Sequence, residues 1–140
     1  MIVDFFYENP SYKIFSEEKV ISLLSLISNL EKSELGEIDI QIVSDKKILE
    51  INQEFLNHDY FTDIITFDNS LLNIINGELI ISFDTVKSNA RKYGIIDTQE
   101  MYRVIIHGIM HLNGYNDSSE SEKSLMTEKE NEYLSYLEKI

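Results

Sequence analysis

The chain has 140 residues, of which 43% are hydrophobic and 26% are charged, and its formal net charge is −13. This length fits one domain with one hydrophobic core, and we expect residues 1–140 to form it. The absence of cysteine excludes disulfides and thiolate metal ligands. The strongly negative net charge argues against a nucleic-acid partner, although a local basic patch can coexist with an acidic total.

The first half of the chain alternates predicted strands and helices. Residues 2–7 are apolar and aromatic, which is typical of a strand. Ser16 begins a helix whose apolar residues recur at helical spacing up to Leu30, and Gly36 is the expected end of this unit. Residues 38–43 (IDIQIV) then alternate with the period of two that indicates a half-buried strand.

A helix and a hairpin are predicted next. Ser44 is a suitable N-cap for a helix that continues to about Phe55. Residues 62–67 (TDIITF) and 77–83 (GELIISF) are β-branched and apolar, as strands are. Because the link between them is short, we expect these two strands to pair as a hairpin.

Three helices complete the chain. The first ends at Gly94, which suits a left-handed C-cap, and the second begins with Asp97 as its expected N-cap. Their predicted ranges are 84–93, 97–111 and 121–137. The order of the elements predicts an α+β (mixed α/β) fold, in which a small mixed four-stranded sheet packs against about five helices.

The sequence shows no sign of a membrane or of export. No apolar run approaches roughly 20 residues, the length that a helix needs to cross a bilayer. The N-terminal residues lack the basic start and the small-residue cleavage site of a signal peptide. We therefore expect a cytoplasmic protein without a membrane partner.

A metal site is predicted near residue 110. His107 and His111 lie four apart on a predicted helix, so both imidazoles leave the same face, as two ligands of one ion must. Gly114 suits the end of that helix, after which Asp117 can return a carboxylate to the ion. Three protein ligands leave one position for water, as catalytic zinc sites require. Such ligands favour one Zn²⁺, and Ni²⁺, Mn²⁺ or iron also suit them.

Two residues near this site have a second interpretation. Asp117 precedes the last predicted helix and also suits its N-cap. His58, the third histidine, lies between a helix and a strand. It is either a solvated loop residue or a side chain that faces the site as an acid, a base or a phosphate contact.

The segment HGIMHLNGYND at residues 107–117 resembles the signature of the YbeY family, bacterial single-strand endoribonucleases of ribosomal RNA maturation. Further blocks match in the same order over residues 35–137, and several ordered blocks are more specific than one motif. They comprise Asn52, Asp59, residues 62–67, residues 77–82, Met126 and Glu130. The resemblance implies a metal-dependent hydrolase that cleaves single-stranded or ribosomal RNA, with the small ribosomal subunit or a ribosome-associated protein as a further partner.

Two positions depart from the family pattern. Asp117 stands where the family usually has a third histidine, and Leu56 stands where it has an arginine thought to contact the substrate. The predicted replacement for that arginine is Arg103, four residues before His107, and other candidates are Lys87, Arg91 and Lys92. In this interpretation the ion activates water, Arg103 balances the charge on phosphate, and further residues orient the ligand or stack on bases. These further residues are Asn52, Thr62, Asp63, His58, Tyr60, Phe61 and Tyr115.

Two other functions remain open. The spacing of His107, His111, Gly114 and Asp117 is also that of metzincin metalloproteases, but Gly108 stands where those enzymes need a glutamate base. Alternatively the metal is structural and the protein is a non-catalytic ribosome-binding factor. That alternative requires a fourth protein ligand, for which the candidates are His58, Glu120 and Glu122.

Overall fold

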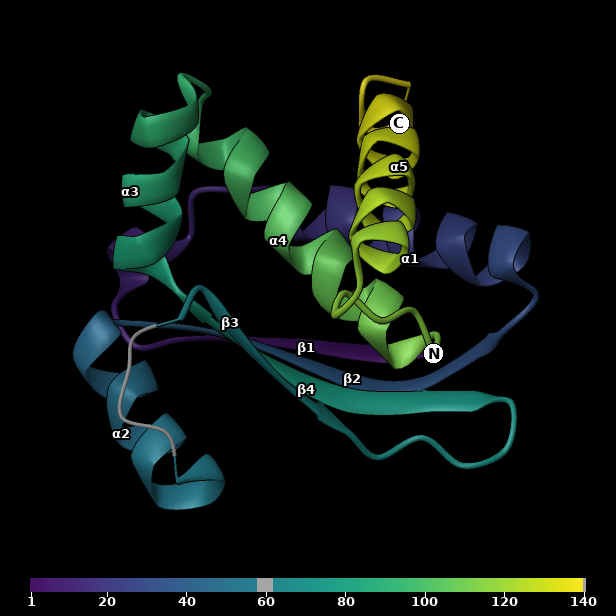
Figure 1. Ribbon diagram of the computed structural model, residues 1–140, viewed down its shortest axis with the longest axis horizontal. Coiled ribbons are helices and arrows are strands. Elements are labelled where there is room, and N and C mark those ends of the chain that lie inside the picture. Colours follow the sequence, from purple (N-terminus) through teal and green to yellow (C-terminus); the bar gives the residue numbers. More distant parts are fainter. Residues whose placement is uncertain (58–61, 140) are drawn as a thin grey trace.

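A four-stranded sheet organises the fold of the computed structural model, which describes residues 1–57 and 62–139 (Figure 1). The strands lie in the order β1-β2-β4-β3, with β1, β2 and β4 parallel and β3 antiparallel to β4. Their bounds are β1 Ile2–Tyr7, β2 Glu34–Val43, β3 Ile64–Asp68 and β4 Ile74–Ser82. The predicted mixed sheet and its hairpin are therefore confirmed.

Five α-helices surround the sheet in a single domain, as predicted, together with a short 3-10 helix at Pro10–Tyr12. Figure 1 shows α2 on one face of the sheet and the other four helices on the opposite face. Within residues 1–57 and 62–139, no helix combines the length and the apolar character that crossing a membrane requires. The helices are α1 Glu17–Glu31, α2 Asp45–Leu56, α3 Phe83–Tyr93, α4 Asp97–Leu112 and α5 Glu120–Leu137.

The main core lies between the sheet and the four-helix face. The alternation predicted for residues 38–43 is confirmed, because Ile38, Ile40 and Ile42 are fully buried toward this face. A smaller apolar cluster lies under α2 and comprises Val43, Ile48, Ile51, Ile65 and Ile80. Since burying one such side chain contributes about 1.5–3 kcal/mol, these clusters supply most of the driving force for folding.

Helix α4 is the central helix of the core and lies directly on the hairpin. Ten of its 16 residues are buried. A Cβ atom at Gly108 would lie 2.7 Å from Leu79 Cδ2 and 2.8 Å from Ile64 Cδ1, which is closer than side chains tolerate. Gly108 thus permits a close approach of α4 to β3 and β4, and this approach determines where the rest of the helix stands.

Several predicted boundaries were wrong, in each case because tertiary packing overrides a local signal. Gly36 does not end the first helical unit but lies inside β2, where a Cβ atom would meet Asn76 Oδ1 at 2.2 Å. The helix ends earlier, at Lys32, with a left-handed φ of 56°. Helix α4 has Ile96 rather than Asp97 as its N-cap, without a side-chain cap hydrogen bond. The lost cap is compensated by the extensive burial of that helix.

The hairpin strands and the last helix also differ slightly from their predicted ranges. β4 begins at Ile74, three residues before the predicted start, and β3 begins at Ile64, two residues after it. Helix α5 is capped by Ser119, whose side chain and that of Glu122 form a reciprocal capping box. Asp117 is therefore not the cap, which leaves its carboxylate available for another role.

Candidate metal centre

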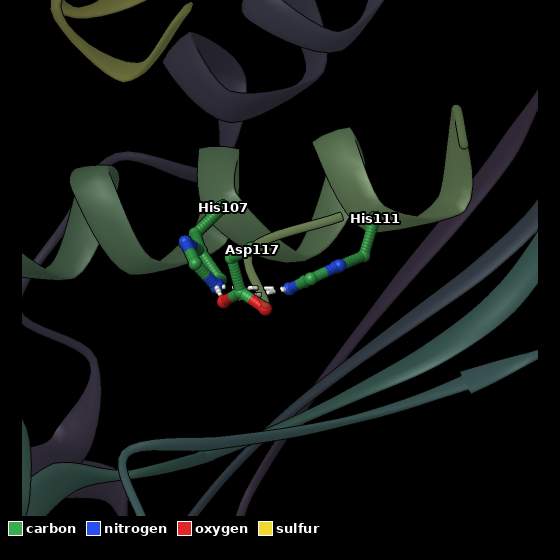
Figure 2. Close-up of side chains that lie close together, drawn as sticks. All are labelled: His107, His111 and Asp117. Carbon is green, nitrogen blue, oxygen red and sulfur yellow. Dashed lines mark hydrogen bonds and ion pairs between the residues drawn. The ribbon is translucent and has the colours of Figure 1, made fainter. Parts of the chain in front are cut away.

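Helix α4 and the loop after it bring three metal-ligating side chains together (Figure 2). The Nε2 atoms of His107 and His111 lie 3.0 Å apart, one helical turn from each other. Gly114, with φ of 95°, ends the helix, and its N–H donates to the carbonyl of His111. The chain then reverses, so that Asp117 Oδ2 lies 3.3 Å from His107 Nε2 and 3.4 Å from His111 Nε2.

The spacing of these three atoms fits one zinc ion. Zinc holds nitrogen and oxygen ligands at about 2.0–2.1 Å in a tetrahedron, so neighbouring ligand atoms lie about 3.3 Å apart. The observed separations of 3.0, 3.3 and 3.4 Å match that edge. Among residues 1–57 and 62–139, no other group of His, Asp or Glu side chains converges in this way. Three protein ligands leave the fourth position of a zinc tetrahedron to a further group.

Each histidine is oriented by a second contact through its other ring nitrogen. His107 Nδ1 lies 2.6 Å from Glu130 Oε2, and His111 Nδ1 lies 2.9 Å from the backbone carbonyl oxygen of Tyr115. A carboxylate and a carbonyl only accept hydrogen bonds, so each Nδ1 carries the proton and donates it. Both Nε2 lone pairs therefore face the site, which is the tautomer that a metal ligand needs.

Glu130 belongs to a buried network with Arg103 and Glu100. Arg103 donates from Nη1 to Glu130 Oε1 at 2.9 Å and from Nε to Glu100 Oε1 at 2.8 Å. The Glu100 side chain is fully buried, and that of Glu130 is 6% exposed. The hydrogen bond from Arg103 to Glu100 contributes most to an Arg103 pKa above its ordinary value. Arg103, the predicted phosphate contact, is thus engaged by two carboxylates.

The pKa values of His107 and Glu130 show which charges the site favours. Burial alone would lower the pKa of His107, but the hydrogen bond and charge of Glu130, with the charges of Asp63 and Asp117, raise it above its ordinary value. Burial would raise the pKa of Glu130, but His107 and Arg103 hold it below its ordinary value. Glu130 is thus ionised at neutral pH, and the potential at His107 favours a cation.

Two clefts meet at the three ligands. One, of about 400 Å³, we call the β3 cleft; it is lined by His107, His111, Asp117, Thr62, Asp63, Ile64, Thr66 and Asp68. The other, of about 330 Å³, we call the α5 cleft; it is lined by Arg103, His107, Asp117, Lys123, Met126, Thr127 and Glu130. Because His107 and Asp117 belong to both, the ligands form the wall between the clefts.

The other residues predicted for the site lie in several places. Asp63 lines the β3 cleft, whereas Asn52 is buried on α2 and is not among the described residues that line either cleft. The Lys87 ammonium lies over the ring of Phe83 on α3, and Arg91 is exposed on the same helix; neither lines a cleft formed by the described residues. Their assignments to the substrate stay predictions.

The aromatic and loop candidates complete this comparison. Tyr115 donates its hydroxyl hydrogen to Glu31, and its ring lies beneath the ammonium of Lys129. The side chain of Tyr115 is therefore part of the packing, while its backbone carbonyl orients His111. His58, Tyr60 and Phe61, the remaining candidates, lie outside the described residues.

Sequence reasoning assigned no role to Glu100, Lys123 or Glu31, and named Glu130 only as part of the family resemblance. Glu100 carries a local signal, because it stands on the buried stripe of α4 three residues before Arg103, where an unpaired acid would be costly. Glu130 and Lys123 come from α5, and Glu31 comes from α1. Since these three reach the site only through packing of separate helices, no spacing within α4 predicts them.

Known proteins resemble this chain over nearly its whole length. The model of the family described as endoribonuclease YbeY matches residues 8–138. A protein of that name from Parabacteroides distasonis is 39% identical over 98% of this chain and 96% of its own length. One from Bacteroides thetaiotaomicron is 50% identical over 71% of this chain and 73% of its own. A solution structure of a Thermotoga maritima protein, 28% identical, superposes with a TM-score of 0.71 and covers 97% of this chain and 89% of that one.

Proposed function

This chain belongs to the YbeY endoribonuclease family, and from that premise we propose that it hydrolyses phosphodiester bonds of single-stranded RNA during ribosomal RNA maturation, with one bound metal ion. The observation that carries the proposal is the triangle formed by two histidine nitrogens and one carboxylate oxygen at the meeting point of two clefts. Clefts on both sides of His107 and Asp117 give a substrate access to the site.

We assign Zn²⁺ to the ion, held by His107, His111 and Asp117. The ligand types and their spacing support zinc, and Ni²⁺ and Mn²⁺ suit the same atoms. Asp117 stands where relatives of this family usually have histidine, and a carboxylate is a competent zinc ligand. Its negative charge makes the ion a weaker Lewis acid than three neutral histidines would.

The mechanism follows from what the surrounding residues hold in place. When bound, the ion supplies a Lewis acid for the phosphoryl group and acidity for a water molecule. Glu130 and the Tyr115 carbonyl hold the Nδ1 protons of His107 and His111 in place, so that each ring turns its Nε2 atom toward the ion site. Arg103 keeps Glu130 ionised and positioned, and thereby acts on the site through Glu130.

The β3 cleft offers the groups that would meet the substrate. We assign Asp63 as the acceptor of the proton from the attacking water, because its carboxylate lines this cleft and its charge acts on His107. Thr66 lines the same cleft and offers a hydroxyl donor for a phosphate or ribose oxygen, whereas the Thr62 hydroxyl donates to the carbonyl of Ile64.

The geometry disfavours proteolysis. A metzincin-like protease needs a glutamate at position 108, but Gly108 faces Leu79 and Ile64 at distances that leave no room for a side chain. The base of that mechanism therefore has no place on this helix.

A closed structural site finds no fourth ligand among the described residues. Glu122 is held in the capping box of α5 and Glu120 is exposed, and no fourth ligand accompanies the three within residues 1–57 and 62–139. Among the described residues the fourth position is therefore left to water or substrate, and His58, the remaining candidate, lies outside them.

We further propose that the protein acts in the cytoplasm with ribosomal RNA, and that a small-subunit protein or another ribosome-associated protein assists it. A net charge of −13 predicts weak affinity for long RNA by the isolated chain. A partner that supplies positive charge would offset this weakness.

The deciding experiment measures cleavage of an unstructured, end-labelled RNA by protein of known metal content. We expect wild type to cleave. Chelator-treated wild type and His111→Ala should both be inactive. Re-added zinc should restore cleavage to the chelator-treated wild type but not to His111→Ala. The control is Lys46→Ala, an exposed position on α2. Equal cleavage by every sample would identify a contaminating nuclease and overturn the proposal.

A further inference from the structure

The α5 cleft shares a wall with the metal centre and is separate from the β3 cleft. His107 and Asp117 line both clefts. A nucleic-acid strand whose scissile phosphate lies at the ligands would therefore enter the α5 cleft where it leaves the metal centre on that side. The question is which cation in that cleft would receive it.

Among the described residues, only Arg103 and Lys123 are cations that line either cleft. Arg103 is bound to Glu100 and Glu130, so two carboxylates already compensate its charge. The Lys123 side chain is different, because no carboxylate or aromatic ring among residues 1–57 and 62–139 engages it. Lys123 is exposed, and its charge is available to a ligand.

The face of α5 that carries Lys123 suits a phosphate. Thr127 follows Lys123 by one helical turn and lines the same cleft, and both side chains are exposed. An ammonium and a hydroxyl both donate hydrogen bonds to phosphate oxygens. Met126 and Glu130 close the inner end of the cleft, and both are buried.

We propose that the α5 cleft is a phosphate subsite for the RNA strand, in which Lys123 and Thr127 bind the phosphate next to the one that is cleaved. This inference rests on the proposed function. In this proposal Lys123, in the first turns of α5, supplies the positive charge that the family's arginine would supply at the position of Leu56 on α2. It also reassigns the substrate cation from Arg103, which positions Glu130.

The first test compares Lys123→Ala and Lys123→Arg with Lys46→Ala, which changes the net charge equally on a helix on the other face of the sheet (Figure 1). We expect Lys123→Ala to raise KM for a short RNA about tenfold, since one phosphate contact is worth about 1.4 kcal/mol, with kcat and zinc content unchanged. Lys123→Arg should restore KM, and Lys46→Ala should match wild type. Equal KM values for Lys123→Ala and wild type would overturn the proposal.

A second test places the contact on the strand. A substrate with one neutral methylphosphonate link beside the cleaved bond should lose the same factor of about ten with wild type. With Lys123→Ala the neutral link should cost nothing further, because the contact is already gone. Independent losses that multiply would show that Lys123 contacts no neighbouring phosphate, and would overturn the proposal.

A third measurement separates this subsite from the proposed function. Binding of a single-stranded DNA oligonucleotide is measured by fluorescence anisotropy across salt concentrations, which needs no cleavage. Loss of one phosphate contact should reduce the slope of log affinity against log salt by about 0.7 for Lys123→Ala alone. That change would support the subsite even if wild type proved unable to cleave RNA, while an equal change for Lys46→Ala would reduce it to general charge and overturn it.

Discussion

His107 and Glu130 are joined at 2.6 Å between Nδ1 and Oε2, although they lie 23 residues apart on two different helices. The contact fixes the His107 tautomer and links the metal centre to the ion pairs of Arg103. Helix α5, which contributes no metal ligand itself, therefore determines how well α4 presents one.

Replacing Glu130 by glutamine should weaken zinc binding about 10–100-fold, the range found when such supporting partners are removed. The amide keeps the shape but loses the charge that holds the Nδ1 proton. Competition with a chromophoric chelator measures the affinity, and Glu128→Gln, exposed on the same helix, is the matched control. Unchanged affinity in the Glu130 variant would mean that the contact does not tune the ligand.

Tyr115→Phe should also weaken zinc binding, by less than the roughly 10–100-fold loss that follows removal of a direct supporting partner. Its hydroxyl anchors the loop to Glu31, while its carbonyl orients His111. Tyr133→Phe is the control, because Tyr133 donates to the same carboxylate without touching a ligand. Both variants should lose about 1–2 kcal/mol of unfolding free energy. If both weakened zinc equally, the effect would be general destabilisation rather than positioning.

Glu31→Gln should remove part of the acid sensitivity of the fold. Burial would raise the Glu31 pKa, but hydrogen bonds from Tyr115, Tyr133 and Lys129 lower it below its ordinary value of 4.5. Because the folded-state pKa is the lower one, the ionised carboxylate stabilises the fold fully above pH 4.5, and this contribution is lost as the pH falls through the lowered value.

Urea unfolding from pH 7 to pH 3 measures this contribution. Wild type should lose stability below pH 4.5, whereas Glu31→Gln should be weaker at pH 7 by about 2–3 kcal/mol and lose less on acidification. Glu128→Gln should follow the wild-type curve. Parallel curves for Glu31→Gln and wild type would contradict the prediction.

Gly108→Glu should unfold the protein more readily and create no protease. The new carboxylate would be forced against Leu79 and Ile64, and an unpaired buried charge costs about 3–5 kcal/mol. Chemical denaturation and a casein digest measure the two outcomes, with Ser124→Glu on the exposed side of α5 as the control. A stable variant that cleaves casein would restore the metalloprotease interpretation.

The parts of the fold that sequence predicted well are those with strong local periodicity. The alternation of residues 38–43 predicted the core strand, and the spacing of His107 and His111 predicted a helix that carries both side chains on one face. Each pattern depends only on residue spacing within one strand or one helix, so it does not depend on how that element packs against the rest of the protein.

The errors concern features that depend on contacts between separate elements. Gly36 resembles a terminator, but the adjacent strand β4 brings Asn76 against it and keeps it extended in β2. Arg103 was correctly placed beside His107, yet Glu130 arrives from α5 and engages it. No short-range pattern shows which distant carboxylate will meet a cation, because that contact depends on how two helices pack.

Helix α4 carries the core on one side and the proposed metal site on the other, with ten of 16 residues buried and His107 and His111 among the remainder. Because one helix serves both, substitutions in the core also affect the site. A substitution that loosens the packing of Ile105 or Ile109, both fully buried, should also shift the histidines on the same helix. Drift in the interior should therefore cost metal occupancy before it costs folding, and compensating changes should accumulate on the β3–β4 hairpin beneath the helix rather than among the ligands.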